Sequence, residues 1–288
     1  MSTVALRRAD VGPTAAPTRD RELLRGFLER DRLFAAYAIC DLDDREFPRT
    51  RWAVARQDGE VVALGVEYEG SSPQPLFVFG SDAGIQAVLR DVLRPRLAYV
   101  AALPERLPAV ARRYRLDAGP QMVRMGVTSE RFRPAEDPGV ERLTPADTPD
   151  LNRLYRLGFG SWLPAQSVTE GVYFGLRIHG RLVAAAGTHI VSRAARLAVV
   201  GNVMTAAEFR GRGYAKAVTA AVTAELLGFC DDVVLNVRAD NPPALNAYRR
   251  IGYLEHVRYE ERLARRSGSL LGEIGAALRR RLLPGDPA

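Results

Sequence analysis

Apolar and polar residues follow two periods along this chain, a two-residue alternation typical of strands and a longer one typical of helices. Helical periodicity covers residues 21–40. Two strand-like runs then flank Asp58-Gly59, a strong signal for a β-hairpin, and residues 75–95 predict a strand, a glycine-containing turn and a helix. Strands at 96–103 and 120–128, with a helix at 104–116 between them, complete the first half.

A similar order of elements follows residues 130–139, a charged segment with two prolines and a glycine. Thr144 and Asn241 are predicted N-caps because each precedes a proline at the first helical position. His179-Gly180 marks a turn between two strands, and Gly252 stands where a helix ends. The predicted elements are a helix after Thr144, strands within 171–192, at 196–204, 233–238 and 254–263, a helix from the glycine-containing segment 210–213 to Gly228, and a helix from Asn241 to Gly252.

The repeated order of elements predicts two α/β domains with mixed sheets, the second better marked than the first. We expect a flexible N-terminus at 1–20, a domain at 21–129, a linker at 130–139, a domain at 140–263 and a tail at 264–288 with an amphipathic helix.

Composition narrows the class of protein. The chain has 288 residues, 47% of them hydrophobic, enough for a substantial core. Without an apolar run of 18 residues or a signal-like N-terminus, we expect a cytoplasmic protein with no membrane partner. Cys40 and Cys230 match no metal spacing and are expected to be buried thiols, and three scattered histidines do not predict a metal site.

The net charge of +7 comes almost entirely from arginine, since Lys216 is the only lysine. A modest positive charge attracts anionic ligands. We do not expect nucleic acid as a partner, because the preference for arginine over lysine is typical of a GC-rich genome and the excess is interpreted as a solvated surface.

The segment "VMTAAEFRGRGYAKAV", residues 203–218, carries the strongest chemical signal. It links a predicted strand to a predicted helix, and a helix N-terminus with nearby glycines binds phosphate groups well. The pattern is neither the Walker sequence nor the dinucleotide G-x-G-x-x-G, since Lys216 occupies the third glycine position. It therefore predicts a pyrophosphate site of another kind.

Arg210, Gly213 and Ala215 form R-x-x-G-x-A, which resembles the acyl-CoA-binding signature of the GNAT (general N-acyltransferase) superfamily. The downstream segment "VVLNVRADNPPALNAYRRIGY" is similar to the next motif of that family, with Asn241, Ala244, Tyr248 and Gly252-Tyr253. The resemblance implies two GNAT-like folds in tandem, clear over 140–263 and limited to the order of elements over 21–129. Gly80 and Gly84 stand at the corresponding turn of the first half without arginine, so we expect that half to be degenerate and unable to bind the cofactor.

The resemblance also implies how acetyl-CoA is held. Backbone groups of Val203, Met204 and Thr205 would pair with the pantetheine amides, and Asn241 would contact the cofactor near its thiol. The pyrophosphate would lie on the glycine loop, whose implied binding residues are Arg210, Gly211, Arg212, Gly213, Tyr214, Ala215 and Lys216.

Tyr248 matches the position of the family's general acid, which donates to the departing thiolate; packing in the apolar core is its alternative role. A base is harder to assign, because the strand 196–204 has no carboxylate and Asn202 is its only polar side chain after Arg196. We expect a water chain ordered by Asn202 or Asn236 to take the amine proton. His189 either faces the substrate or is a structural residue of its strand.

The function implied is direct transfer of an acetyl group from acetyl-CoA to an amine of a small molecule or peptide. A non-catalytic acyl-CoA sensor is the alternative from another class, and transfer of a longer acyl chain is a third reading. The amine and the oligomeric state stay open.

Overall fold

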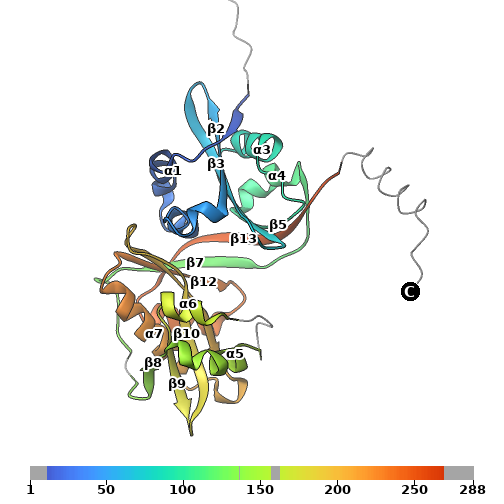
Figure 1. Ribbon diagram of the computed structural model, residues 1–288. Helices are drawn as coiled ribbons and strands as arrows, with labels where there is room; N and C mark the ends of the chain where they lie inside the picture. Colours follow the sequence, from blue (N-terminus) through green and yellow to red (C-terminus); the bar gives the residue numbers. More distant parts are fainter. Residues whose placement is uncertain (1–11, 136, 157–162, 269–288) are drawn as a thin grey trace, which may run out of the picture. The chain divides into compact units, whose positions relative to one another are not determined.

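The computed structural model describes residues 12–135, 137–156 and 163–268, which form two compact units (Figure 1). The first unit contains Trp52–Gly119 together with residues 12–18 and 262–268. The second contains Arg19–Arg51 and Pro120–Glu261. The predicted C-terminal amphipathic helix and residues 1–11 of the predicted flexible N-terminus lie outside the described residues.

The division differs from the predicted boundaries, because Arg19–Arg51 belongs to the second unit rather than to a 21–129 domain. The reason is packing: the buried side chains of helix α2 (Ala36–Cys40) lie on strands of the second unit, where the Cys40 thiol contacts the Leu197 carbonyl at 3.7 Å. The N-terminal prediction is wrong at Thr14–Pro17, which form strand β1 against β2.

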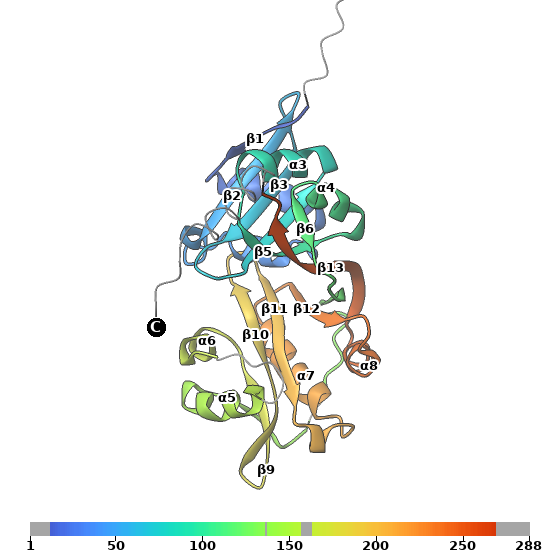
Figure 2. The same ribbon diagram turned by 90° about the vertical axis from the view of Figure 1, so that its right-hand side faces the viewer.

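The first unit is a mixed sheet with helices (Figure 2). Its strands, in spatial order, are β1, β2, β3, β4, β5 and the end of β13, which also pairs with β6. Their bounds are β2 Thr50–Gln57, β3 Glu60–Tyr68, β4 Gln74–Gly80, β5 Leu97–Ala102, β6 Tyr114–Leu116 and β13 Leu254–Arg266; the helices are α3 Asp82–Asp91 and α4 Leu107–Ala111, the latter after a 3₁₀ turn at Pro104–Arg106.

Local signals explain much of this unit. Asp58 and Gly59 both have positive φ (52° and 88°), as a tight hairpin turn requires, so the predicted hairpin is confirmed. The helix predicted at 104–116 is too long: it ends at Ala111, and Tyr114 is buried while Arg115 is exposed, the alternation of a strand.

The second unit is also a mixed sheet, in the order β13, β7, β12, β11, β10, β9, β8, with only β11 and β12 parallel. Its other strands are β7 Gln121–Val127, β8 Val140–Arg142, β9 Phe174–Ile178, β10 Arg181–Ser192, β11 Leu197–Thr205 and β12 Asp232–Arg238. Its helices are α1 Arg21–Leu28, α2, α5 Thr148–Arg156, α6 Ala165–Glu170, α7 Tyr214–Leu227 and α8 Pro242–Arg250, with 3₁₀ turns at Glu29–Asp31, Phe47–Arg49, Pro145–Asp147 and Ala207–Phe209.

Turn and cap residues are again placed as predicted. His179 and Gly180 take positive φ in the β9–β10 turn. The Asn241 side chain caps α8 by accepting from the Ala244 N–H at 3.3 Å. Gly252 has φ 102°, and a Cβ there would lie 2.2 Å from the Arg131 carbonyl oxygen, so only glycine fits.

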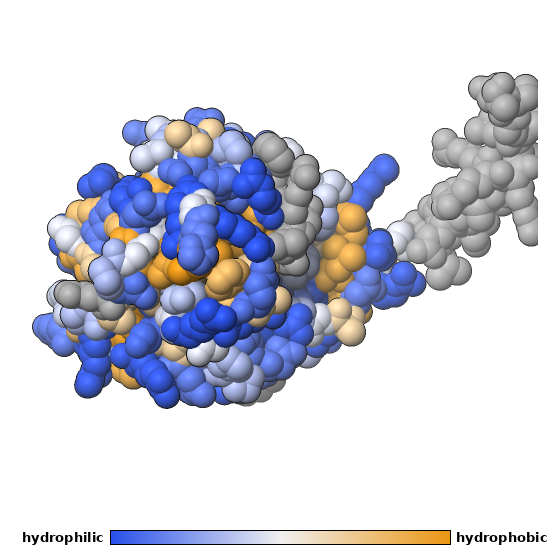
Figure 3. Space-filling model, turned by 90° about the horizontal axis from the view of Figure 1, so that it is seen from below, coloured by the Kyte–Doolittle hydropathy of each residue, from blue (hydrophilic) through white to orange (hydrophobic). Residues whose placement is uncertain are grey.

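The core of the second unit packs α7 and α8 against the strands, and it includes both the predicted inward face of β12 (Val233, Leu235, Val237) and Cys230. Cys40 and Cys230 are both buried, as predicted. Figure 3 shows one face of the molecule, on which hydrophilic side chains surround smaller apolar areas.

Candidate active site

Strands β11 and β12 stop pairing halfway along their length. Their parallel register begins at Leu197↔Asp232 and ends at Val200↔Leu235. Beyond that point β12 continues against β7, as far as Arg238, and β11 continues against β10, as far as Thr205. The two strands therefore part after Val200 and Leu235, and we call this place the splay.

A β-bulge in β11 lies at the splay. Gly187 pairs with Gly201 and Ala185 pairs with Met204, so β11 has one residue more than β10 over this stretch. The extra residue is accommodated at Asn202, whose φ is +52°, a conformation that asparagine tolerates better than most residues. Bulges bend and twist the strand that carries them, which accounts for the departure of β11 from β12.

Backbone groups beyond the bulge face the side that β12 has left. The Ala206 N–H donates to the Val183 carbonyl on β10 at 2.9 Å. Since backbone groups alternate along a strand, those of Val203 and Thr205 point away from β10, whereas those of Met204 point toward it. The Thr205 carbonyl accepts from Arg210 Nε at 3.2 Å, and the Thr205 hydroxyl oxygen is enclosed with no partner among the described residues.

The glycine loop ends in an open helix N-terminus. Gly211 and Gly213 have φ of 78° and 85°, and a Cβ at either would meet no protein atom within 4 Å. Helix α7 starts after Gly213 without a side-chain cap and without an acidic residue in its first turn. Its first N–H groups have no intrahelical acceptor, so they are available to an anion.

Basic side chains surround this helix end. Arg212 stacks on Phe209, 5.3 Å from the ring centroid, and Arg210 is held by the Thr205 carbonyl. Glu208 is paired with Arg181 at 2.8 Å, which partly neutralises the one carboxylate of the loop. The loop therefore keeps the positive field that the sequence predicts.

Tyr248 lies in the core of the second unit. Its side chain is 6% exposed, and its ring centroid is 6.2 Å from that of Tyr253. Burial raises the pKa of Tyr248 to about 12. The hydroxyl thus stays protonated near neutral pH and keeps a proton that it can donate in a hydrogen bond.

A chain of polar side chains reaches the splay from the other direction. Arg124 on β7 donates through Nε to Asn236 Oδ1 at 2.6 Å, Asn236 Nδ2 donates to the Tyr37 hydroxyl at 3.4 Å, and that hydroxyl is 2.5 Å from His189 Nδ1. Asn236 directly follows Leu235, and the His189 ring covers Gly201, which directly follows Val200. These side chains meet where the two strands part.

Asn202 is held by tyrosines rather than left free. Its Nδ2 donates to the Tyr173 hydroxyl at 3.0 Å, and its backbone carbonyl accepts from Tyr155 at 2.9 Å. Tyr173 in turn donates to the Thr188 carbonyl at 2.9 Å. Burial raises the pKa of Tyr173 to about 12, although the Asn202 hydrogen bond lowers it in part. Asn202 is thus a fixed part of the site.

The His189 side chain is exposed to solvent, although protein groups around it also desolvate it in part. Desolvation by the surrounding protein lowers its pKa, and a hydrogen bond with the Asn202 side chain partly offsets this. Because the side chain is exposed to solvent, the lowering is weaker than full burial would cause. Desolvation is the larger effect, so the pKa of His189 is lowered and its imidazole is neutral at pH 7.

The sequence brought Asn202, Asn236 and His189 into consideration but not Tyr37 or Arg124. Tyr37 stands in the apolar stretch "AAYAIC", where an aromatic residue reads as core, and Arg124 is one of many arginines. No local sequence signal could have predicted that these residues meet, because Tyr37 and His189 are 152 residues apart in the sequence.

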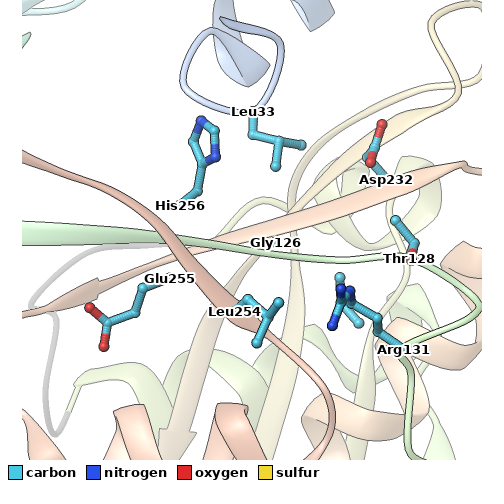
Figure 4. Close-up of a pocket in the computed structure, with 9 residues that line it drawn as sticks. Leu33, Gly126, Thr128, Arg131, Asp232, Leu254, Glu255 and His256 are labelled. Atoms are coloured by element: carbon cyan, nitrogen blue, oxygen red, sulfur yellow. The ribbon is translucent and has the colours of Figure 1, made fainter.

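A separate hollow of about 230 Å³ lies beside β7 and β13 (Figure 4). Its charged groups are largely paired: His256 with Asp31 at 2.6 Å, and Asp232 with Arg32 at 2.9 Å. Figure 4 shows its labelled side chains spread along β7 rather than converging on one point. It shares no lining residue with the predicted site.

Comparisons with known proteins support the fold and the family. The model of the acetyltransferase (GNAT) family matches residues 141–253. No protein in the curated collection matches the chain. Residues 141–253 are therefore a domain of the acetyltransferase (GNAT) family, which supports acyl transfer in general.

Solved structures extend the likeness to most of the chain. A GCN5-related N-acetyltransferase from Sphaerobacter thermophilus is 16% identical, with TM-score 0.58, covering 89% of this chain and 97% of its own. A tandem GNAT protein from the clavulanic acid biosynthesis pathway is 15% identical, with TM-score 0.52 and coverage of 89% and 99%. A Drosophila protein is 14% identical, with TM-score 0.65 and coverage of 88% and 99%. At these identities the likeness concerns the fold, and it bears out the predicted mixed α/β fold with tandem GNAT relatives.

Two kinds of feature are absent from the described residues. No group of three or more histidine, cysteine, aspartate or glutamate side chains is arranged to hold a metal ion. No described helix combines the length and the apolar character needed to span a membrane.

Proposed function

We propose that the second unit binds acetyl-CoA and transfers its acetyl group directly to a primary amine of a small molecule or peptide. One observation carries the proposal: the splay between β11 and β12 runs into an uncapped, basic helix N-terminus at the glycine loop. An extended ligand that ends in a pyrophosphate fits that combination.

The pantetheine arm would lie along β11. The outward backbone groups of Val203 and Thr205 would pair with its amides as an added strand does, and the enclosed Thr205 hydroxyl would gain a partner. Met204 is less suited to this role, since its backbone groups face β10. Asn241, which caps α8, would contact the cofactor near its thiol end.

The pyrophosphate would lie on the N–H groups of residues 211–216. Hydrogen bonds to a charged group contribute about 1.5–3 kcal/mol each, so a few of them offset the ordering cost of a long, flexible ligand. Arg210, Arg212 and Lys216 would add positive charge around the site.

In the reaction the amine nitrogen attacks the carbonyl carbon of the thioester, and the carbon–sulfur bond breaks. Tyr248 would donate a hydrogen bond to the sulfur as negative charge develops on it. With a pKa of about 12 against ~8.5 for a thiol, complete proton transfer from Tyr248 would be uphill by about 5 kcal/mol. The proton on the final thiol therefore comes from solvent, and Tyr248 stabilises the transition state electrostatically.

The cysteines favour direct transfer over a covalent intermediate. Cys40 and Cys230 are buried, and desolvation raises the pKa of Cys230 to about 11, although nearby arginines lower it in part. Neither thiol is a good nucleophile at pH 7, because the thiolate is the reactive form.

The test is thiol release from acetyl-CoA in the presence of spermidine, L-lysine, glucosamine and a peptide with a free N-terminus. With an accepted amine, Tyr248→Phe should lower kcat at least 10-fold and leave the Kd for CoA unchanged. Tyr253→Phe is the matched control: Tyr253 is a neighbouring buried tyrosine that bonds Thr223, so its loss should reduce stability rather than rate.

The outcomes separate the alternatives. CoA binding without thiol release from any amine, in wild type and variant alike, would favour a non-catalytic acyl-CoA sensor. Faster release from butyryl-CoA or a longer donor would point to transfer of a longer acyl chain.

A further inference from the structure

The donors and acceptors at the splay favour one direction of hydrogen bonding, from Arg124 towards His189. Arg124 has only donors, so the Asn236 oxygen accepts from it and the Asn236 amide group donates to the Tyr37 oxygen. The one proton of Tyr37 is then free to be donated to His189 Nδ1, 2.5 Å away. The hydrogen bonds on the Tyr37 side of His189 therefore leave Nδ1 as the unprotonated nitrogen.

The hydrogen bonds on the Asn202 side of His189 lead to the same tautomer. Tyr173 donates to the Thr188 carbonyl, so its oxygen accepts from Asn202 Nδ2. The Asn202 oxygen is then left to accept from His189, and the Asn202 hydrogen bond raises the histidine pKa in part. Because Nδ1 lies beside the Tyr37 hydroxyl, Nε2, which lies over Gly201, is the ring nitrogen left to donate.

The pair is accessible and lies beside the expected reaction centre. Tyr37 is half-buried and His189 is exposed to solvent. The Tyr37 oxygen accepts one hydrogen bond, from Asn236, and has a second lone pair. The splay next to both residues is where the thioester of an extended donor would end.

Several charged or titratable groups face the pair from neighbouring elements. The Arg124 guanidinium is 5.4 Å from the Tyr37 ring centroid and opposes a further positive charge. Glu261 on β13 accepts from Tyr259 at 3.0 Å, and its negative charge favours a further positive charge near Tyr37. Cys40, on the same helix as Tyr37, and Tyr173, beyond Asn202, are neutral at pH 7 because burial raises the pKa of each.

We propose, on the basis of the proposed acetyl transfer, that Tyr37 and His189 form the proton relay that serves as the general base. One proton of the substrate ammonium group passes to the Tyr37 oxygen, and the Tyr37 proton passes at the same time to His189 Nδ1. The freed amine nitrogen then bonds to the carbonyl carbon, the carbon–sulfur bond breaks, and a second N–H proton is lost to solvent, which protonates the departing thiolate. The imidazolium then releases a proton to solvent, so the pair is regenerated and the products are an amide and a thiol.

This relay supplies the base that β11 lacks. The predicted water chain ordered by Asn202 or Asn236 is replaced by protein groups, and the two asparagines become positioning residues that fix the direction of the hydrogen bonds. His189 is neutral before the reaction, because desolvation lowers its pKa. It can therefore accept a proton at pH 7.

The tautomer can be measured without any turnover. The chain has three histidines, so ¹⁵N spectra of a histidine-labelled protein can be assigned with the His179→Asn and His256→Gln variants. The relay requires the Nδ1 resonance of His189 to be that of an unprotonated nitrogen accepting a hydrogen bond, and Nε2 to be protonated. A protonated Nδ1 in the neutral ring would overturn the proposal, whatever the activity.

The pH dependence of kcat/KM tests the relay in the reaction, with acetyl-CoA and the fastest amine of the panel above. His189→Gln keeps an amide near the Nε2 position and removes Nδ1; we expect kcat/KM to fall about 100-fold or more at pH 7, with the Kd for CoA unchanged. The loss should shrink as pH rises toward ~10, where the amine loses its proton without help. Tyr37→Phe should show the same trend, and His179→Asn, in the β9–β10 turn, should match the wild type.

Two results would contradict the relay but not acetyl transfer. One is an unchanged kcat/KM in both variants at pH 7. The other is a loss of the same size at every pH, as a purely structural role would give. Failure of the proposed function shows differently, as absence of thiol release in the wild type.

Discussion

Each unit has a helix that starts at the end of a strand with a parallel neighbour, and the two helix starts differ in one decisive way. The parallel register covers Gln74↔Ala98 to Phe77↔Ala101 before α3, and Leu197↔Asp232 to Val200↔Leu235 before α7. Helix α3 caps itself, however, because the Ser81 side chain accepts from the Gly84 N–H at 3.2 Å. Helix α7 starts after Gly213 with no side-chain cap.

The two helix starts also differ in the charge of their first turn and in the free space beside their glycines. Asp82 places a carboxylate in the first turn of α3, paired with Arg106 at 2.9 Å, whereas the first turn of α7 has no acid. A Cβ at Gly80 would lie 2.4 Å from the Val62 carbonyl oxygen, whereas the same atom at Gly213 would meet open space. Similar backbone arrangements therefore give a closed helix start in the first unit and an open one in the second, where we propose the anion site.

The next helix of each unit shows a second contrast. Helix α8 carries Tyr248, a buried hydroxyl donor, while α4 is "LPAVA" and has no side-chain donor. In the first unit, the start of α3 is therefore capped, and the following helix α4 has no tyrosine.

The largest expected effect comes from giving α7 the acid that α3 has. Ala215→Asp should raise the Kd for CoA at least 100-fold, about 2.7 kcal/mol, because a carboxylate in the first turn repels the pyrophosphate. The helix itself should be stabilised by ~0.3–1 kcal/mol by the same charge. Isothermal titration calorimetry gives the first quantity and urea unfolding the second.

Ala224→Asp is the matched control for this change, since it places the same residue at an exposed position nearer the other end of α7. It should leave the Kd for CoA unchanged. Binding by Ala215→Asp within threefold of the wild type would mean that the phosphates do not lie on this helix.

The reverse change in the first unit should lower the free energy of unfolding and should not create CoA binding. Ser81→Ala with Asp82→Ala removes the cap and the first-turn acid of α3, a loss of about 1–2 kcal/mol in the free energy of unfolding. CoA binding should not appear, because Gly80 is still closed by Val62. Measured in the Ala215→Asp background, where α7 is blocked, any restored CoA binding would contradict this comparison.

A smaller effect is expected from the loop arginine. Arg212→Gln should weaken CoA binding about 3- to 10-fold and reduce its dependence on salt, because one cation near the phosphates is lost. Arg193→Gln is the control, since Arg193 also stacks on a phenylalanine, Phe229, but away from the loop. Equal losses in the two variants would show an effect of overall charge alone.

The sequence predicts well where one or two residues determine the local backbone. The turns at Asp58-Gly59 and His179-Gly180 and the Asn241 cap are all in place, since each depends on a local preference for positive φ or a cap. Helix α7 also ends near Gly228 as predicted, although that glycine keeps helical backbone angles. Helix α6 went unpredicted, because "AQSVTE" has little apolar periodicity.

Features that depend on distant contacts could not be predicted. The transfer of Arg19–Arg51 to the second unit depends on where α2 packs, and the hydrogen bond between Tyr37 and His189 depends on that packing. The bulge at Asn202 is visible only from the register with β10. The acyl-CoA motif located the loop, but the groups proposed as the base come from a part of the chain that the motif does not include.

The most direct test of the central claim, that the start of α7 and not that of α3 holds the cofactor, is a CoA titration of wild-type protein labelled with [¹⁵N]glycine. The chain has 25 glycines, and triple-resonance spectra of the unaltered sequence assign the four that matter. We predict large amide shifts at Gly211 and Gly213 and none at Gly80 and Gly84. Shifts at Gly80 and Gly84 instead, or no shift at any of the four with millimolar CoA, would contradict the account.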